Sequence, residues 1–122
     1  MKVAVLGSGS GGNAAVIKAR DTTMLVDAGL SARQLSRRLE QVGVDPDSLD
    51  GILLTHEHRD HTCGLEVFLR KRSTPVFTTA LTRESLGDRV TGSVDWRIFQ
   101  HGQAFKIGEV TVEAFALPHD AV

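Results

Sequence analysis

The chain has 122 residues, which is room for one modest domain and not for two. Lys and Arg total 14 while Asp and Glu total 15, so the net charge of −1 excludes a strongly basic nucleic-acid coat. The single cysteine, Cys63, cannot form an internal disulfide, and no stretch approaches the roughly 20 apolar residues of a membrane helix. We therefore expect a soluble, cytoplasmic protein that has no membrane contact.

The first part of the chain has the pattern of three short strands. Residues 3–6 are apolar and lead into the glycine-rich residues 7–12, which predicts a strand that ends in a tight loop. Residues 13–19 and 22–27 are rich in Val, Ile and Thr, with the turn-like pair Arg20-Asp21 between them. We predict strands in all three segments.

The middle of the chain combines an amphipathic helix with a buried strand. Ser31 is a suitable N-cap, and Gly43 is typical of a helix end. Between them the apolar residues recur at intervals of three and four, which predicts one buried helix face: Ala32, Leu35, Leu39 and Val42. After a turn at 45–47, the apolar residues 52–55 predict a strand covered on both faces.

The remaining elements are predicted from shorter patterns. Residues 61–70 place their apolar side chains on one face, and the basic residues 70–72 follow where a helix end favours cations, so we predict a second helix here. We also predict a strand over 75–78, a short helix over 81–86 that ends at Gly87, and strands over 97–100 and 110–117.

The residues with the clearest chemistry directly follow the strand predicted at 52–55. Three of the five histidines lie within six residues, at positions 56, 58 and 61. His56 and His58 are two residues apart and should point the same way from a strand, so that both imidazoles can converge on one metal ion. Asp60 and His61 lie past the strand end and can bind a second ion beside the first. The spacing predicts a dinuclear metal site, and we disfavour a merely solvated polar loop.

This segment, His56-x-His58-x-Asp60-His61, is the HxHxDH signature of the metallo-β-lactamase superfamily, which the sequence therefore resembles. Asp27, at the end of an apolar strand, looks like the first motif of that superfamily. The glycine-rich residues 7–13 and the residues 115–121 resemble the branch called YycJ, WalJ or VicX. The resemblance extends from residue 3 to residue 121.

The resemblance implies an α/β (α+β) fold, the αββα sandwich, with residues 1–122 as approximately the N-terminal half of a single domain. It implies two sets of metal ligands: His56, His58 and His119 for one ion, and Asp60 and His61 for the other. Asp60 would also be catalytic, and Asp27 would orient the ligands through hydrogen bonds. The bridging aspartate and final histidine of the family have no counterpart before Val122, so we expect the domain to continue beyond it.

The resemblance also implies a metal-dependent hydrolase with two divalent ions, zinc being expected and manganese or iron being alternatives. Two neighbouring ions lower the pKa of a water molecule, so that hydroxide becomes available near neutral pH. The expected substrate is a phosphodiester, with a nuclease acting on DNA, and more finely a 5′ exonuclease, as the activity. A thioester or small-ester hydrolase of the glyoxalase II type and a non-catalytic metal-binding fragment stay open. A second copy of the chain could cover the open half-fold.

The glycine-rich loop has a second interpretation as a dinucleotide site. Gly7-x-Gly9-x-x-Gly12 follows a strand, and Asp27 lies 20 residues after Gly7, near the position of a ribose-binding carboxylate. Residues 13–20 are too few for the crossover helix that such a site requires. In the resembled fold the loop runs under the metal site, where its polar side chains could donate to a substrate phosphate: Ser8, Ser10 and Asn13. A plain turn without ligand is the alternative.

Three weaker signals have ordinary structural explanations. We expect Cys63 to be a small buried thiol and His101 to be a surface loop residue. The basic clusters at 33–38 and 70–72 are interpreted as solvated helix faces, with phosphate contact as the alternative.

Overall fold

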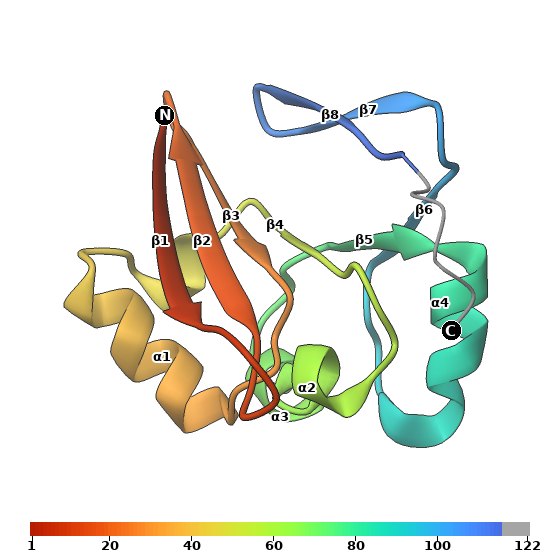
Figure 1. Ribbon diagram of the computed structural model, residues 1–122, viewed down its shortest axis with the longest axis horizontal. Helices are drawn as coiled ribbons and strands as arrows, with labels where there is room; N and C mark the ends of the chain where they lie inside the picture. The colour runs from red at the N-terminus through yellow and green to blue at the C-terminus, as the bar shows by residue number, and fades with distance from the viewer. Residues whose placement is uncertain (116–122) are drawn as a thin grey trace.

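The computed structural model describes residues 1–115, which form one mixed sheet and a separate hairpin (Figure 1). The sheet has the order β1-β2-β3-β4-β5-β6. Its strands are β1 (Lys2–Gly7), β2 (Ala14–Ala19), β3 (Thr22–Val26), β4 (Gly51–Leu53), β5 (Val76–Thr79) and β6 (Trp96–Phe99). Strands β1 to β3 pair antiparallel, and β3 to β6 pair parallel. The hairpin joins β7 (Ala104–Ile107) to β8 (Val110–Glu113).

Helices connect the parallel strands, because a parallel pair requires a crossover and not a tight turn. Helix α1 (Ala32–Gln41) and the 3₁₀ turn η1 (Pro46–Ser48) lie between β3 and β4. Two short helices, α2 (Arg59–Thr62) and α3 (Leu65–Leu69), precede β5, and α4 (Ala80–Leu86) with the turn η2 (Gly87–Arg89) precedes β6. Within residues 1–115, no helix combines the length and the apolar character that a membrane crossing needs.

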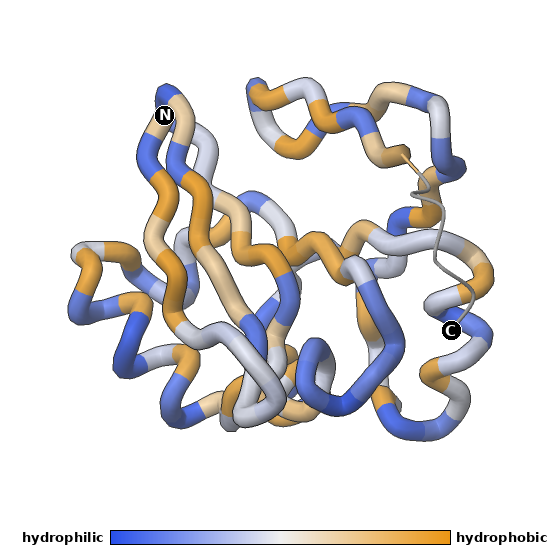
Figure 2. The backbone as a smooth tube through the Cα atoms, viewed as in Figure 1, coloured by the Kyte–Doolittle hydropathy of each residue, from blue (hydrophilic) through white to orange (hydrophobic). Residues whose placement is uncertain are grey.

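The central strands bury alternate residues in two different clusters, as the period of two along a strand requires. Leu25, Ile52 and Val76 pack with apolar residues of α1, α3 and α4. Met24 and Phe77, their neighbours along the chain, pack instead against the hairpin. Figure 2 shows the apolar stretches of the strands on which both clusters draw. The helices therefore cover one face of the sheet and the hairpin lies over the other.

The hairpin leaves the β1 end of its sheet face open. Val3 lies opposite Ile17 in the β1–β2 register, and Ile17 packs against the cluster on the hairpin side. Val3 and Val5 are nevertheless 57% and 67% exposed. An apolar strip of the outer strands thus has no cover within the described residues.

The strands predicted at 3–6, 13–19, 22–27 and 75–78 are confirmed within a residue or two, as is the helix that begins after Ser31. The predicted burial of Val42 is wrong, because this residue lies at the C-cap and is 46% exposed. The Ser31 side chain caps this helix by accepting a hydrogen bond from the Gln34 N–H at 3.2 Å. The predicted helix over 81–86 is confirmed as α4, and Gly87 follows its last residue.

The single helix predicted over 61–70 is wrong, because the chain breaks into α2 and α3 at Cys63 and Gly64. In a continuous helix the Gly64 N–H would donate to the carbonyl of Asp60, four residues earlier. It donates instead to the carbonyl of Ala28 at 2.9 Å, while the Asp60 carbonyl accepts the Asn13 N–H at 2.7 Å. Contacts with two distant loops have replaced the helical bond.

The strand predicted over 110–117 is confirmed only in part. It is present as β8, which ends at Glu113, and residues 116–122 lie outside the described residues. Its partner β7 was not predicted from the sequence. The chain turns between the two strands at Gly108, whose φ of 57° favours glycine.

Candidate metal centre

The candidate site lies where two neighbouring parallel strands end. Strand β3 runs beside β4 with Val26 opposite Leu53, and the Asp27 N–H extends this pairing by donating to the Leu53 carbonyl at 2.8 Å. The carboxyl ends of parallel strands meet at one edge of the sheet, which is where ligand sites in such sheets form. This register brings Asp27 beside the segment from Thr55 to His61.

The β1–β2 loop, the β3–α1 loop and the short helix α2 meet at this edge through their backbones (Figure 1). The Asn13 N–H donates to the Asp60 carbonyl at 2.7 Å, and the Ala28 N–H donates to the His61 carbonyl at 2.7 Å. The Gly29 N–H closes the set by donating to the Asn13 carbonyl at 2.9 Å. A Cβ at Gly29 would lie 1.8 Å from the Asp60 carbonyl oxygen, so only glycine allows this approach. The segment from His56 to His61, which carries predicted ligands, is therefore fixed by backbone contacts.

Asn13 connects the glycine-rich loop to Asp60 through its side chain. Its Oδ1 accepts from the Gly9 N–H at 3.1 Å, and its Nδ2 donates to the Gly9 carbonyl at 2.9 Å and to Asp60 Oδ2 at 3.2 Å. The amide thus closes the loop and orients the Asp60 carboxylate. Ser8 and Ser10 are exposed on the same loop. Since β1 and β2 pair antiparallel without a helix between them, the loop lacks the crossover of a dinucleotide site.

Asp27 is the buried anchor of the site. Only 5% of the residue is exposed, and its φ of 63° is a left-handed value that Asp tolerates better than most residues. Oδ1 accepts from the Thr55 N–H at 2.8 Å, and Oδ2 accepts from the Thr55 hydroxyl at 2.6 Å. His61 Nδ1 lies 2.7 Å from the same Oδ2. Both carboxylate oxygens are therefore used to hold neighbouring residues.

The contact with Asp27 determines which nitrogen of His61 is free. A carboxylate only accepts hydrogen bonds, so His61 Nδ1 carries a proton, and the neutral form of the ring keeps its lone pair on Nε2. A lone pair on an imidazole held in this way by a carboxylate is a standard zinc ligand. His61 Nε2 also lies 3.8 Å from Asp60 Oδ2. The two predicted ligands of the second ion are thus brought together.

The predicted ligands of the first ion are less closely assembled. The rings of His56 and His58 are stacked with their centroids 6.0 Å apart, whereas His56 lies 4.7 Å from the ring of His61. His58 is largely exposed and its Nε2 lies 3.3 Å from Glu57 Oε2. His119, the third predicted ligand, lies outside the described residues. Among residues 1–115, no three His, Cys, Asp or Glu side chains converge closely enough to hold a metal ion.

The donor chemistry nevertheless fits a divalent metal. Neutral imidazoles and a carboxylate are the ligands that zinc takes in proteins, and they surround one strand edge here. Thr55 is the residue of this site whose role was not predicted, although it holds both oxygens of Asp27. Its signal is modest, a hydroxyl directly before the first histidine at the end of an apolar strand.

Cys63 and His101 lie outside this arrangement. The prediction of a buried Cys63 thiol is wrong, because the residue is exposed. Its Sγ contacts the Gly29 carbonyl at 3.0 Å, so that it supports the loop and is not directed at the histidines. His101 is an exposed loop residue, as predicted.

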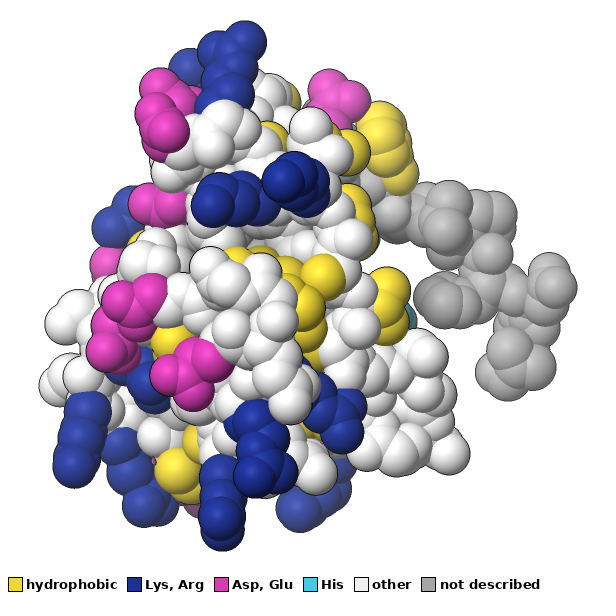
Figure 3. Space-filling model, turned by 90° about the vertical axis from the view of Figure 1, so that its left-hand side faces the viewer, with side chains coloured by type: hydrophobic (Ala, Val, Ile, Leu, Met, Phe, Trp, Pro, Cys, Tyr) yellow, Lys and Arg dark blue, Asp and Glu magenta, His cyan; other side chains and the backbone are white. Residues whose placement is uncertain are grey.

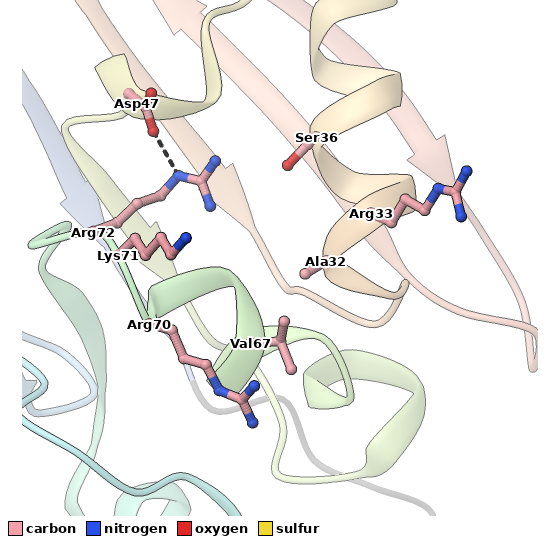
Figure 4. A pocket seen from close by; sticks show the side chains of 8 residues that line it. All are labelled: Ala32, Arg33, Ser36, Asp47, Val67, Arg70, Lys71 and Arg72. Atoms are coloured by element: carbon pink, nitrogen blue, oxygen red, sulfur yellow. Dashed lines mark hydrogen bonds and ion pairs between the residues drawn. The ribbon is translucent and has the colours of Figure 1, made fainter.

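The two basic clusters meet at a groove of about 550 Å³ between α1 and α3, which includes none of the predicted ligands (Figure 4). Arg33 lines one side of it and residues 70–72 line the other. Arg72 Nε donates to Asp47 Oδ1 at 2.8 Å, and Arg70 pairs with Glu66 at 3.7 Å. These carboxylates offset much of the positive charge. Lys and Arg side chains gather over the α1 side of the molecule (Figure 3), as expected for a solvated helix face.

Glu66 also ties α3 to the loop before β6. Its Oε2 accepts from the Thr91 N–H at 2.9 Å and from the Thr91 hydroxyl at 2.8 Å. These hydrogen bonds, aided by Arg70, hold the pKa of the Glu66 carboxyl below its ordinary value of 4.5. This Thr–carboxylate contact resembles that of Thr55 with Asp27 but has no histidine in it.

Residues 7–120 match the family model of the metallo-β-lactamase superfamily. The chain belongs to this superfamily. It is 35% identical over 99% of its length to the exodeoxyribonuclease WalJ of Streptococcus pneumoniae serotype 2. It is 37% identical over 96% of its length to the exodeoxyribonuclease YycJ of Bacillus anthracis. The chain spans about half of these relatives, 46% and 45% of their lengths.

Solved metallo-β-lactamase structures share the fold. MEM-A1, a subclass B3 metallo-β-lactamase from a soil metagenome library, matches with a TM-score of 0.77 and 24% identity. The match covers 95% of this chain and 50% of that enzyme. The predicted α/β metallo-β-lactamase fold, present here as about half of such a chain, is confirmed. Proteins of the metallo-β-lactamase superfamily generally bind divalent metal ions, usually zinc.

Proposed function

We propose that this chain is part of a metal-dependent hydrolase that cleaves phosphodiester bonds of DNA. The observation that carries the proposal is the hydrogen-bonded group at the β3–β4 edge, where Asp27 holds His61 beside His56 and Asp60. The nuclease activity and the DNA substrate are inferred from the two relatives that are named exodeoxyribonucleases. Cleavage from the 5′ end and a cytoplasmic location belong to the same proposal.

Two divalent ions, zinc being the first choice, would be held by the residues that match the family motif: His56, His58 and His119 for one, Asp60 and His61 for the other. When bound, such ions lower the pKa of a water molecule and place positive charge beside the attacked phosphate. The chain itself supplies orientation. Asp27 holds the Nδ1 proton of His61, and Asn13 holds the Asp60 carboxylate in place.

Substrate contacts are assigned to the glycine-rich loop. Ser8 and Ser10 expose hydroxyl groups that can donate to a phosphate oxygen at this edge of the sheet. The Asn13 amide is already bonded to Gly9 and Asp60, so its part in substrate binding would be to shape the loop.

For a further partner we propose a second copy of the chain that covers the open apolar strip around Val3 and Val5.

The test compares two forms of the protein: this chain alone, and this chain fused to the C-terminal half of the Bacillus anthracis relative. Each is assayed on DNA labelled at the 5′ or the 3′ end and on a thioester, with zinc or manganese and after chelation. We expect the fused form to release nucleotides from the 5′ end only when metal is present. Thioester hydrolysis without DNA cleavage would favour the glyoxalase II alternative, and DNA cleavage that survives chelation would contradict the proposal.

A non-catalytic metal-binding module is the second candidate. It is favoured by the observation that no three ligand side chains converge within residues 1–115. If the fused form binds two ions per chain and hydrolyses neither substrate, this candidate is the better explanation.

A further inference from the structure

We propose that Thr55 is a positioning residue that fixes the protonation of the His56 ring by relaying the hydrogen bonding of Asp27. The Thr55 hydroxyl lies between the two groups, with Oγ1 2.6 Å from Asp27 Oδ2 and 2.9 Å from His56 Nδ1. The Thr55 N–H also donates to Asp27 Oδ1 at 2.8 Å. The carboxylate therefore holds Thr55 at two points, which leaves the hydroxyl little freedom to turn.

The direction of each hydrogen bond follows from the number of protons available. A hydroxyl has one proton to donate, and a carboxylate can only accept. The Thr55 proton therefore points to Asp27 Oδ2, and a lone pair of Oγ1 faces His56. The imidazole nitrogen on that side, Nδ1, must then be the donor. His56 carries its proton on Nδ1 and keeps the Nε2 lone pair for a ligand.

One buried carboxylate thus sets two rings. His61 donates directly to Asp27 Oδ2 at 2.7 Å, while His56 reaches the same oxygen through the Thr55 hydroxyl. The ring centroids lie 4.7 Å apart. In the neutral form of each ring, these hydrogen bonds place the proton on Nδ1 and leave the Nε2 lone pair free. In water a free histidine favours the opposite form, with the proton on Nε2. The relay therefore prepares both imidazoles to bind a cation before any cation arrives.

The relay is tested on the metal-free 122-residue chain by long-range ¹H–¹⁵N NMR of the histidine rings, at a pH at which they are neutral. We expect both His56 and His61 to carry the proton on Nδ1. In Thr55→Val, which keeps the shape but lacks the hydroxyl, we expect His56 to change to Nε2–H while His61 stays unchanged. Thr55→Ser should restore the wild-type pattern. Thr91→Val removes a matched Thr–carboxylate contact, that with Glu66, and should leave both rings unchanged.

Zinc affinity provides a second measurement. We expect Thr55→Val to weaken zinc binding by about 10- to 100-fold, the range measured for residues that orient metal ligands, with Thr55→Ser close to wild type. Nε2–H on His56 in the wild type, no change in Thr55→Val, or an equal loss of affinity in Thr91→Val would overturn the proposal. If Thr55→Val does not fold, Asp27→Asn replaces it, and both rings must then change.

The relay rests on the proposed function only in that its role would be to prepare the metal ligands of the hydrolase. The two proposals can therefore fail separately. The ring protonation is read without metal or substrate. If the NMR patterns are as expected but the fused form is inactive, the proposed hydrolase function is refuted and the relay is supported. If the fused form is active but His56 carries its proton on Nε2, the relay is refuted and the hydrolase function is supported.

Discussion

At the scale of single residues, Asp27 holds both Thr55 and His61 through its carboxylate. It accepts three hydrogen bonds from Thr55 and His61 while being almost fully buried. A buried carboxylate is costly unless its oxygens are satisfied, and here each one has a partner. Asp27 thus combines a buried carboxylate with a left-handed backbone, and it orients two other residues. Such a combination is typical of a functional site.

Asp27→Asn should weaken metal binding more than it weakens the fold. Asn also tolerates a left-handed φ and can keep the bond from the Thr55 N–H, but it loses part of the acceptor capacity for His61. We expect a loss of about 10- to 100-fold in zinc affinity with a small change in the melting temperature. Zinc titration and thermal unfolding check this. Unfolding as severe as that of Leu25→Ala, a core deletion, would make Asp27 a structural residue.

His56→Ala and His58→Ala should each lower zinc affinity by at least about tenfold, because each removes a ligand of the same proposed ion. His101→Ala is the matched control, since this histidine is exposed in the β6–β7 loop, is no proposed ligand and should leave the affinity unchanged. Elemental analysis after dialysis against zinc gives the metal content. If either site variant retains the wild-type content, the ligand assignment is wrong.

At the scale of elements, the site depends on backbone contacts between loops that are far apart in sequence. The β1–β2 loop, the β3–α1 loop and helix α2 exchange backbone hydrogen bonds through Asn13, Ala28 and Gly29. The same contacts end α2 early and separate it from α3. Precise placement of the ligands and interruption of the helix therefore have one cause.

Gly29→Ala tests that packing. The added Cβ would meet the Asp60 carbonyl oxygen at 1.8 Å, so the loops must separate, and we expect a destabilisation of about 3 kcal/mol or more. Gly11→Ala is the control, because a Cβ there meets nothing within 4 Å. Urea unfolding measures both. Equal stabilities of the two variants would show that the two loops and α2 are not tightly packed in solution.

The sequence predicts what is local and misses what depends on distant partners. The histidine segment and the α1 stripe are contiguous patterns, so the candidate site and the first helix could be predicted. Strand β7 could not, because its four residues become a strand only by pairing with β8. The break at Gly64 and the role of Thr55 likewise depend on Ala28 and Asp27, which lie more than 25 residues away in the chain.

At the scale of the whole molecule, the helix face of the sheet is finished and the other face is not. Apolar residues of α1, α3 and α4 pack on the first face, whereas the hairpin leaves the β1 end of the second face open. The site lies at the edge of the same sheet, and its ligand set is also incomplete within the described residues. Within residues 1–115, both the cover of the sheet and the proposed ligand set are incomplete. The chain spans about half of the relatives that it matches.

The 122-residue chain alone should therefore be a poor hydrolase even when metal is supplied. With few converging ligands, an ion at this edge would be weakly held, and the positive charge that opposes the developing charge on the phosphate would be absent for most of the time. Loss of a single hydrogen-bond donor to such a charge already lowers kcat by about 10²- to 10³-fold, and a divalent ion carries more charge than a donor.

The comparison is between the chain alone and the chain fused to the C-terminal half of the Bacillus anthracis relative, with metal occupancy measured for both. We expect the fused form to be faster by at least about 10²-fold on bis-p-nitrophenyl phosphate. We expect fusion to add both sheet cover and metal ligands, so a fused form with its proposed ligand histidines replaced by alanine separates the two effects. That variant should be as stable as the fused form and as slow as the chain alone. Equal turnover per chain, with two ions bound to the 122-residue chain, would show that these residues complete the site by themselves.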